Sequence, residues 1–258
     1  MAGGRVIRGL RAAADILLPR RCIVCGRKLL LAEEHLCLYC LSDIPHTYFW
    51  TVKHNPMSDK FNSVLQKHLE EKWETEGIQG YVRERYAYAN ALFFYDSDGD
   101  YRHIPYQIKY HGNTRAGRFF GNMLGQKVAG TSWMKDIDIV IPVPLHWRRK
   151  WARGYNQAEI IAAEVASVLN VPLKTDILKR RRYTRTQTKM DIPSKSVNVA
   201  DAFTIQDFTT CGHYRHILLV DDVFTSGSTL MACFTALRAV FPPSVRISVA
   251  TLAFVGEV

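Results

Sequence analysis

Short apolar runs alternate with longer segments of helical spacing in the C-terminal half of the chain. Ile217, Leu218, Leu219 and Val220 form a continuous apolar run, which is typical of a strand buried on both faces. From about Ser228 onward, apolar residues recur at the three- to four-residue spacing of a helix. The pattern therefore predicts a buried strand, a loop and a helix in direct succession.

The same succession occurs earlier in the chain. Residues 137–143 form a second apolar run, and residues 158–169 have the spacing of an amphipathic helix. The segment VRISVATLAF, residues 245–254, predicts a late strand. Repeated strand–loop–helix units are typical of an α/β fold, so we expect a doubly wound parallel sheet. In such a sheet, ligands bind at the carboxyl ends of the strands.

The N-terminal half is patterned less regularly. Residues 61–77 and 112–130 predict helices, with Gly112 as the break before the second one. Between them, residues 91–95 predict a strand that turns at Ser-Asp-Gly as a hairpin, followed by a helix from about Tyr101.

Three regions follow from these patterns. Residues 1–45 are expected to form an N-terminal helix and a cysteine module, residues 46–130 a connecting or hood region, and residues 131–258 the main α/β domain.

The N-terminal segment is basic and amphipathic. Its apolar positions fall on one face of a helix, and they are Val6, Ile7, Leu10, Ala14 and Leu17. Arg8, Arg11 and Asp15 interrupt the apolar run, so a secretory signal peptide is not expected. This helix either packs on the body of the protein or makes a peripheral contact with a membrane.

Two acids and a loop of small residues follow the predicted strand. Asp221 and Asp222 come first, and the loop is Thr225-Ser226-Gly227-Ser228-Thr229. Backbone N–H groups of such a loop, at the start of a helix, can close around a phosphate, and the hydroxyls add donors. The carboxylates suit the vicinal hydroxyls of a ribose. The pattern G-x-x-x-x-G-K-[ST] is absent, which argues against a nucleoside triphosphatase. The alternative is an ordinary strand end with an acidic helix cap.

Two basic segments add cations. The loop that follows residues 137–143 carries His146, Arg148, Arg149, Lys150 and Arg153, and a cationic loop at this edge suits pyrophosphate binding. The segment of residues 179–203 has little apolar content, and it contains Arg180, Arg181, Arg182, Arg185, Lys189 and Lys195. It predicts an excursion that closes over bound phosphates. For both segments the alternative is a solvated basic surface or a nucleic-acid patch.

Four of the six cysteines form two C-x-x-C pairs: Cys22, Cys25, Cys37 and Cys40. Two such pairs with a short connector are typical of a zinc ribbon with four thiolate ligands, which leave no open position for a substrate. Gly26 allows the positive φ that such a turn requires. Two disulfides or free thiols are the alternatives, and reduced thiols are favoured because no export signal is recognised. Cys211 and Cys233 lack partners in any motif.

Composition adds two constraints. The chain has 258 residues, of which 47% are hydrophobic and 22% charged, as in ordinary folded proteins. It contains no apolar run of about 18 residues, so no membrane-spanning helix is expected. The formal net charge of +10 favours phosphate-rich ligands, nucleic acid included.

Together the motifs resemble one family. The segment ILLVDDVFTSGSTL, residues 217–230, is similar to the phosphoribosyl-pyrophosphate (PRPP) motif of type I phosphoribosyltransferases. The whole order resembles the ComF family of competence proteins: the four-cysteine module, IKYHG, IPVPLHWRRKWARGYNQAE, TRTQT with NVADAF, and then the PRPP motif.

The resemblance implies a type I phosphoribosyltransferase domain behind an N-terminal zinc finger. It implies that Asp221 and Asp222 bind the ribose hydroxyls of PRPP, and that residues 225–229 hold its 5′-phosphate. Residues 142–149 would be the pyrophosphate loop, with Mg²⁺ held mainly by the ligand. The implied pyrophosphate contacts are Pro144, Leu145, His146, Arg148 and Arg149, with Lys109 and Arg153 nearby.

The family also implies a role in natural transformation, in which the protein handles incoming single-stranded DNA in the cytoplasm together with DNA-uptake or DNA-processing proteins. Trp147, Trp151 and Tyr155 are candidates for stacking on a strand. Two alternatives remain. One is an active phosphoribosyltransferase with an unknown acceptor, for which the sequence indicates no catalytic base. The other is a non-catalytic binder that PRPP regulates.

Overall fold

The structure is a computed structural model that describes residues 19–76, 84–181, 202–206 and 214–256. Two of the expected features lie outside these residues: the N-terminal amphipathic helix and, over residues 182–201, most of the basic excursion. Both therefore stay predictions.

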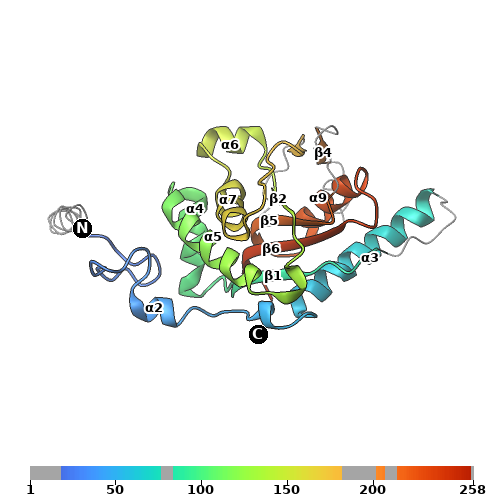
Figure 1. The fold of residues 1–258 in the computed structure, drawn as a ribbon. Helices are drawn as coiled ribbons and strands as arrows, with labels where there is room; N and C mark the ends of the chain where they lie inside the picture. The colour runs from blue at the N-terminus through green and yellow to red at the C-terminus, as the bar shows by residue number, and fades with distance from the viewer. Residues whose placement is uncertain (1–18, 77–83, 182–201, 207–213, 257–258) are drawn as a thin grey trace.

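A four-stranded parallel sheet forms the centre of the molecule (Figure 1). Its strands are, in spatial order, β1 (Ala89–Phe94), β6 (Arg246–Phe254), β5 (His216–Phe224) and β2 (Ile139–Pro142). Every neighbouring pair is parallel, and parallel neighbours need crossover connections. Helices supply these connections and cover both faces of the sheet, which confirms the predicted doubly wound α/β fold.

The central strand β5 shows why its apolar run is continuous. Ile217 and Leu219 belong to the core on one face, and Leu218 and Val220 belong to the core on the other face. All four side chains are fully buried. Since successive side chains of a strand alternate between faces, a strand that is covered on both sides needs apolar residues at every position.

Four long helices make the two outer layers. Helices α5 (Thr114–Ala129) and α7 (Gln157–Leu169) pack against each other and against one face of the sheet. Helices α3 (Pro56–Glu76) and α9 (Ser228–Arg238) lie on the other face (Figure 1). These four helices confirm four of the predicted ones. α3 begins earlier than expected because the Asn55 side chain accepts the backbone N–H of Ser58, which caps a helix that starts with proline.

Shorter elements complete the described chain. They are α2 (Leu38–Ser42), η1 (Phe49–Thr51), η2 (Asp100–Arg102), α4 (His103–Tyr110), η3 (Ser132–Met134), α6 (Trp147–Arg153), β3 (Leu178–Arg180) and β4 (Phe203–Ile205). β3 and β4 form an antiparallel pair apart from the main sheet. Gly112, with φ of +67°, separates α4 from α5 as predicted.

The expected hairpin at residues 91–95 is wrong. The strand exists as β1, but its partner is the parallel strand β6. The turn residues do not return the chain beside β1. Asp96 accepts the N–H of Asp98, and the chain then enters η2 and α4. Turn residues mark a change of direction, but they do not specify the partner of a strand.

A second difference concerns the two acids. β5 does not end at Val220 but continues to Phe224, because β6 runs beside it as far as Phe254. Asp221 and Asp222 are thus held inside a strand and not in a loop.

Three glycines let α5 approach α7 closely. Gly117, Gly121 and Gly125 are spaced four apart on the face of α5 that meets α7. A Cβ at Gly121 would lie only 3.0 Å from the carbonyl oxygen of Ile161. The absence of side chains along this stripe therefore sets the distance between the two helices.

The cysteine module lies at one end of the molecule, before α3 (Figure 1). It contacts the body through Tyr101, whose hydroxyl donates to the Cys40 carbonyl at 2.8 Å, and through the ring of His35, 5.4 Å from that of Phe119. Among the described residues, no helix combines the length and hydropathy needed to cross a bilayer.

Candidate functional site

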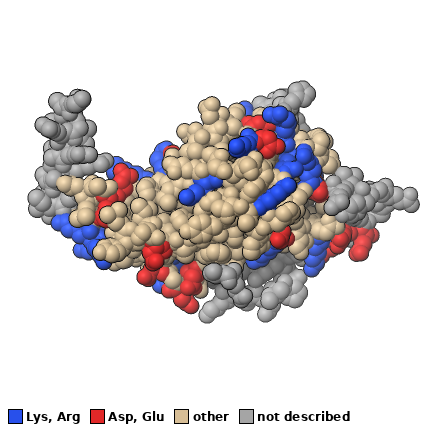
Figure 2. Space-filling model, turned by 60° about the horizontal axis from the view of Figure 1, so that its bottom comes forward, with Lys and Arg blue, Asp and Glu red and all other residues tan. Residues whose placement is uncertain are grey.

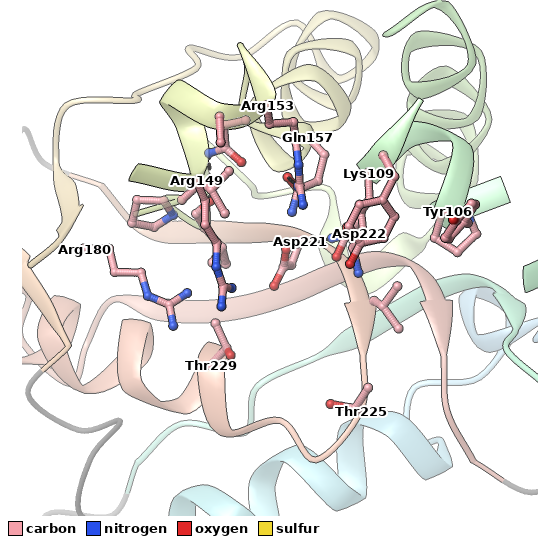
Figure 3. Close-up of a pocket in the computed structure, with 18 of the residues that line it drawn as sticks. Tyr106, Lys109, Arg149, Arg153, Gln157, Arg180, Asp221, Asp222, Thr225 and Thr229 are labelled. Carbon is pink, nitrogen blue, oxygen red and sulfur yellow. Dashed lines mark hydrogen bonds and ion pairs between the residues drawn. The ribbon is translucent and has the colours of Figure 1, made fainter. Parts of the chain in front are cut away.

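A cavity of about 750 Å³ opens where β2 and β5 end. Its walls come from α4, the loop after β2, α6, the start of α7, β3, and the segment that leads from β5 into α9. Figure 3 shows charged side chains from these elements pointing into one space. The carboxyl edge of the sheet therefore gathers polar groups from positions far apart in the sequence, as parallel sheets do.

The two acids reach the cavity from opposite faces of β5. Because side chains alternate along a strand, Asp221 lies on the side of α9 and Asp222 on the side of α4. Asp222 is buried, and its Oδ2 lies 3.1 Å from Nζ of Lys109 on α4. The Oδ1 atom of Asp221 accepts the backbone N–H of Asp222 at 2.9 Å.

This arrangement shifts the pKa values of two groups. Burial, and after it the charge of Asp222, raises the pKa of Asp221 to about 7, although Lys109 and Arg180 act in the opposite direction. Burial alone would lower the pKa of Lys109, but the two carboxylates outweigh burial and raise it. Lys109 thus stays a cation that neutralises the Asp222 side of the pair.

The small-residue loop leads directly into α9. Gly227 is the N-cap with φ of +78°, and an added Cβ there would lie 2.9 Å from the Phe224 ring, so only glycine fits. Thr225 and Thr229 line the cavity. The free N–H groups at the start of a helix, with the positive end of its dipole, attract an anion.

Cations face these groups. Arg149 and Arg153 of α6 and Arg180 of β3 line the cavity, and in Figure 3 the guanidinium groups of Arg149 and Arg180 point toward the side of Thr229. Figure 3 shows the guanidinium groups of Arg149 and Arg180 near each other, and burial and then the like charge of Arg149 lower the pKa of Arg180. A pair of close cations at a helix N-terminus suits a multiply charged anion.

The expected pyrophosphate loop is partly helical. Asn156 orders it, because its side chain caps α7 at Ala158 and donates to the Val143 carbonyl at 3.0 Å. His146 is buried and caps α6 by accepting the N–H of Arg148. The guanidinium of Arg148 lies 5.2 Å from the centre of the Trp147 ring.

Most, but not all, of the residues singled out in the sequence meet in the cavity. Those that line it are Asp221, Asp222, Thr225, Thr229, Pro144, Leu145, Arg149, Arg153 and Lys109. Those outside its lining are Ser226, Gly227, Ser228, His146 and Arg148. Gly227 shapes the loop and His146 caps a helix, so both contribute to the conformation of the cavity walls.

Several lining residues were not singled out as site residues from the sequence. Tyr106 and Tyr110 join Lys109 on one face of α4, at a spacing of three and four residues, so an aromatic and cationic helix face was the available signal. Gln157 accepts a hydrogen bond from Arg153. The β3–β4 pair positions Arg180 at the cavity, and no local sequence pattern predicts that position.

The four cysteines of the module form a second candidate site. Their sulfur atoms all lie within 4.8 Å of one another, and Sγ of Cys25 and Cys37 are 3.7 Å apart. Zinc–sulfur bonds of about 2.3 Å in a tetrahedron place sulfur atoms about 3.8 Å apart, whereas a disulfide needs about 2.05 Å. The four thiols are free and fit a zinc ion.

Details of the module agree with this fit. Gly26 has a φ of +71°, as the predicted turn requires. Burial would raise the pKa of Cys22, but hydrogen bonds from the backbone, led by Cys25, lower it to about 7. The pKa of Cys40 is raised, first by burial and then by hydrogen bonds with the other three cysteines, so the four thiols interact as one group. His35 packs on Phe119 and is not part of the cluster.

Parts of the chain are similar to known proteins. Residues 156–256 match the model of the phosphoribosyl transferase domain. The chain is 37% identical over 108 residues to competence protein F of Haemophilus influenzae, which is 42% of this chain and 47% of that protein. It is 34% identical over 93 residues to the DNA utilization protein YhgH of Shigella flexneri, which is 36% of this chain and 40% of that protein.

A longer match of 130 residues, at 28% identity, relates the chain to YhgH of Salmonella typhimurium and spans 49% of this chain and 56% of that protein. The matches thus span about half the length of these curated relatives. They confirm the resemblance to the ComF family that the order of motifs predicted.

Proposed function

We propose that this chain, a ComF-like protein with a phosphoribosyl transferase domain, binds PRPP in the cavity between α4, α6 and β5. One observation carries the proposal. An acid pair, the N-terminus of α9 and the arginines of α6 and β3 line the same space. These three features match a ligand with free hydroxyls, a phosphate monoester and a pyrophosphate group. Few ligands other than a phosphorylated sugar with a pyrophosphate group carry all three together.

Each group has a role in this proposal. Backbone N–H groups of residues 225–229 and the Thr229 hydroxyl hold the 5′-phosphate. Asp221 and Asp222 accept hydrogen bonds from the ribose hydroxyls, and Arg149 and Arg153 bind the pyrophosphate. The carboxylates beside the pyrophosphate groups also suit Mg²⁺, which prefers phosphate and carboxylate oxygens and supplies charge neutralisation when bound.

Calorimetric titration with Mg·PRPP tests the assignment. The double variant Asp221→Asn, Asp222→Asn should lose binding while its circular dichroism stays that of the wild type. Arg149→Ala should bind about tenfold to a hundredfold more weakly, since hydrogen bonds to charged groups contribute about 1.5–3 kcal/mol. Arg148→Ala is the matched control, because Arg148 lies outside the cavity lining. Equal affinities for all four proteins would refute the proposal.

We further propose that the protein acts in DNA uptake and binds single-stranded DNA. Its relatives are named for competence and for DNA utilization. Trp147 and Trp151 of α6 are 64% and 86% exposed, beside the basic residues of the same helix. Aromatic rings among cations bind a single strand by stacking and phosphate contact. Tyr155 is less suited, because its hydroxyl donates to the Ile108 carbonyl.

A fluorescence titration with oligothymidylate at several salt concentrations tests this part. Stacking contributes about 1–3 kcal/mol per base, so Trp147→Ala with Trp151→Ala should weaken binding at least tenfold and leave PRPP binding unchanged. The affinity of the wild type should fall steeply with salt. An affinity that the double variant retains in full would refute a role for α6.

Two alternatives keep PRPP as the ligand. In the first, the protein is an active phosphoribosyltransferase that displaces pyrophosphate from the anomeric carbon in favour of an unidentified acceptor. In the second, PRPP binds without turnover and regulates the DNA interaction. Release of pyrophosphate in the presence of candidate amines and bases distinguishes them, since only the first alternative predicts turnover.

The remaining parts of the proposal concern the surroundings of the domain. A zinc ion in the cysteine cluster has a structural role, because four protein ligands leave no open position. Residues 1–18 make a peripheral membrane contact, and the protein works in the cytoplasm with DNA-processing partners.

A further inference from the structure

Exposed apolar side chains gather on the outer part of the cysteine module. Leu30, Leu31, Leu38 and Tyr39 are 66%, 55%, 63% and 71% exposed. Single exposed leucines are common, but several that adjoin one another indicate an interaction surface.

The arrangement of these side chains is built by a buried acid. One carboxylate oxygen of Glu33 accepts the N–H of Leu30 at 2.6 Å, and the other accepts the N–H of Leu38 at 2.8 Å. Glu33 itself is only 8% exposed. Leu30 and Leu38, the first residue of α2, are therefore held close to each other by one carboxylate.

Cations surround the apolar group. The guanidinium of Arg27 lies 4.7 Å from the centre of the Tyr39 ring, and Arg20 donates to the Leu30 carbonyl at 3.2 Å. Arg21 donates to the Gly26 carbonyl at 3.1 Å, and Lys28 is exposed in the same loop. Two cations thus contact residues of the apolar group, and Arg21 and Lys28 add two more positive charges to the same module.

The module also carries two exposed acids, Glu34 and Asp43. Asp43 follows α2, in which the Cys40 carbonyl accepts a hydrogen bond from the Tyr101 hydroxyl. The four cations of the module outnumber its acids, Glu33 included.

We propose that this leucine face, defined as Leu30, Leu31, Leu38 and Tyr39 with Arg20, Arg21, Arg27 and Lys28, docks on a lipid bilayer that carries anionic headgroups. The apolar side chains enter the boundary between headgroups and acyl chains, and the guanidinium and ammonium groups stay at the level of the phosphates.

Charge and position favour a bilayer over a protein groove. A bilayer offers an anionic layer above an apolar layer at every point, which is the order in which this face presents its groups. Figure 1 places the module at one end of the molecule, and none of its residues lines the cavity. The proposal uses described residues only and does not depend on PRPP binding.

Flotation with vesicles tests the proposal on the full chain. The protein is mixed with vesicles of phosphatidylcholine and phosphatidylglycerol, and separately with vesicles of phosphatidylcholine alone. The wild type should float with the anionic vesicles and bind the neutral ones at least about tenfold more weakly, since each juxtamembrane cation contributes about 1 kcal/mol. Leu30→Ser with Leu38→Ser should lower binding to anionic vesicles about tenfold or more, because two leucines no longer enter the boundary.

Val52→Ser is the matched control, since Val52 is an exposed apolar residue outside the module. It should float like the wild type. The thermal transition and zinc content of each variant confirm that the module is intact. If the wild type does not float, or the double leucine variant floats as well as Val52→Ser, the leucine face is not a membrane contact. Binding by the leucine variant that equals the wild type would assign any membrane contact to residues 1–18 instead.

Discussion

At the level of single residues, the acid pair determines the chemistry of the cavity. Asp221 and Asp222 are adjacent in a strand, and among the described residues only Asp222 of the two has a lysine within ion-pair distance. Burial, and after it the charge of Asp222, therefore disfavours the ionised form of Asp221.

The raised pKa of Asp221 predicts an unusual dependence of stability on pH. The pKa of Asp221 is raised to about 7, above the value of about 3.9 in an unfolded chain. The folded state therefore binds the proton more tightly. The stabilisation is complete below the unfolded pKa and is lost as pH rises through about 7. Asp221→Asn should raise the free energy of unfolding at pH 8 by about 1–3 kcal/mol, and by little near pH 4.

Urea denaturation at a series of pH values measures this effect in the absence of ligand. Asp98→Asn, at an exposed position, is the control and should follow the wild type. An Asp221→Asn variant that is less stable than the wild type at pH 8 would show that the carboxylate is not destabilising.

The sequence predicted some site residues and not others for a physical reason. The acids and the small-residue loop are contiguous, so their pattern is visible in one segment. Lys109 was assigned only through the family resemblance, and Arg180 belonged to a basic stretch without a defined position. Their places depend on how α4 and the β3–β4 pair pack, which no local pattern records.

At the level of elements, the packing of α5 on α7 positions one wall of the cavity. α7 begins beside the cavity, at Gln157, and α5 follows α4, which carries Lys109. The three glycines of α5 set the distance between α5 and α7. That distance in turn affects the positions of α4 and of the start of α7, which both line the cavity.

Gly121→Val tests this close contact. Its Cβ would lie 3.1 Å from Cα of Ile161, in backbone that cannot move aside easily, so the free energy of unfolding should fall by about 2–3 kcal/mol. Gly130→Ala, at the end of the same helix, meets its nearest neighbours at 3.6 Å and should have no destabilising effect. Equal stability of the two variants would contradict the packing.

The cysteine module is an element whose stability should depend on metal. Removal of zinc by a chelator leaves four thiols within 4.8 Å without their common ligand. Proteolysis within residues 19–45 should then become rapid, while the sheet domain stays resistant. Cys22→Ser should resemble the chelated protein. An unchanged cleavage pattern after chelation would argue against a structural metal.

Secondary structure was predictable where the hydrophobic period was clear. The strands of the sheet core and the helices α5, α7 and α9 follow from the sequence because both faces of the sheet demand apolar residues. The hairpin failed because the partner of β1 is about 160 residues away in sequence, as in the pair Ala89 and Val249. Long-range pairing is decided by the whole fold and not by the turn.

At the level of the whole molecule, the cavity joins two parts of the chain. The matched phosphoribosyl transferase domain, residues 156–256, contains the acid pair and the small-residue loop. Lys109, Arg149 and Arg153 precede that segment. Residues expected as a connecting region also supply β1 to the sheet and α5 to its cover. The matched segment and the preceding chain thus line one cavity.

The distribution of charge on the described surface is consistent with an anionic ligand. Figure 2 shows lysine and arginine side chains spread over one face, with acids in separate groups. A net charge of +10 favours the attraction of polyanions over long distances.

The most direct test is a crystal structure of the protein with Mg²⁺ and PRPP. The account predicts electron density for the ligand in the cavity, with the 5′-phosphate at residues 225–229 and the ribose hydroxyls within hydrogen-bond distance of Asp221 and Asp222. An empty cavity at saturating PRPP, or density for PRPP at another place on the molecule, would contradict the account.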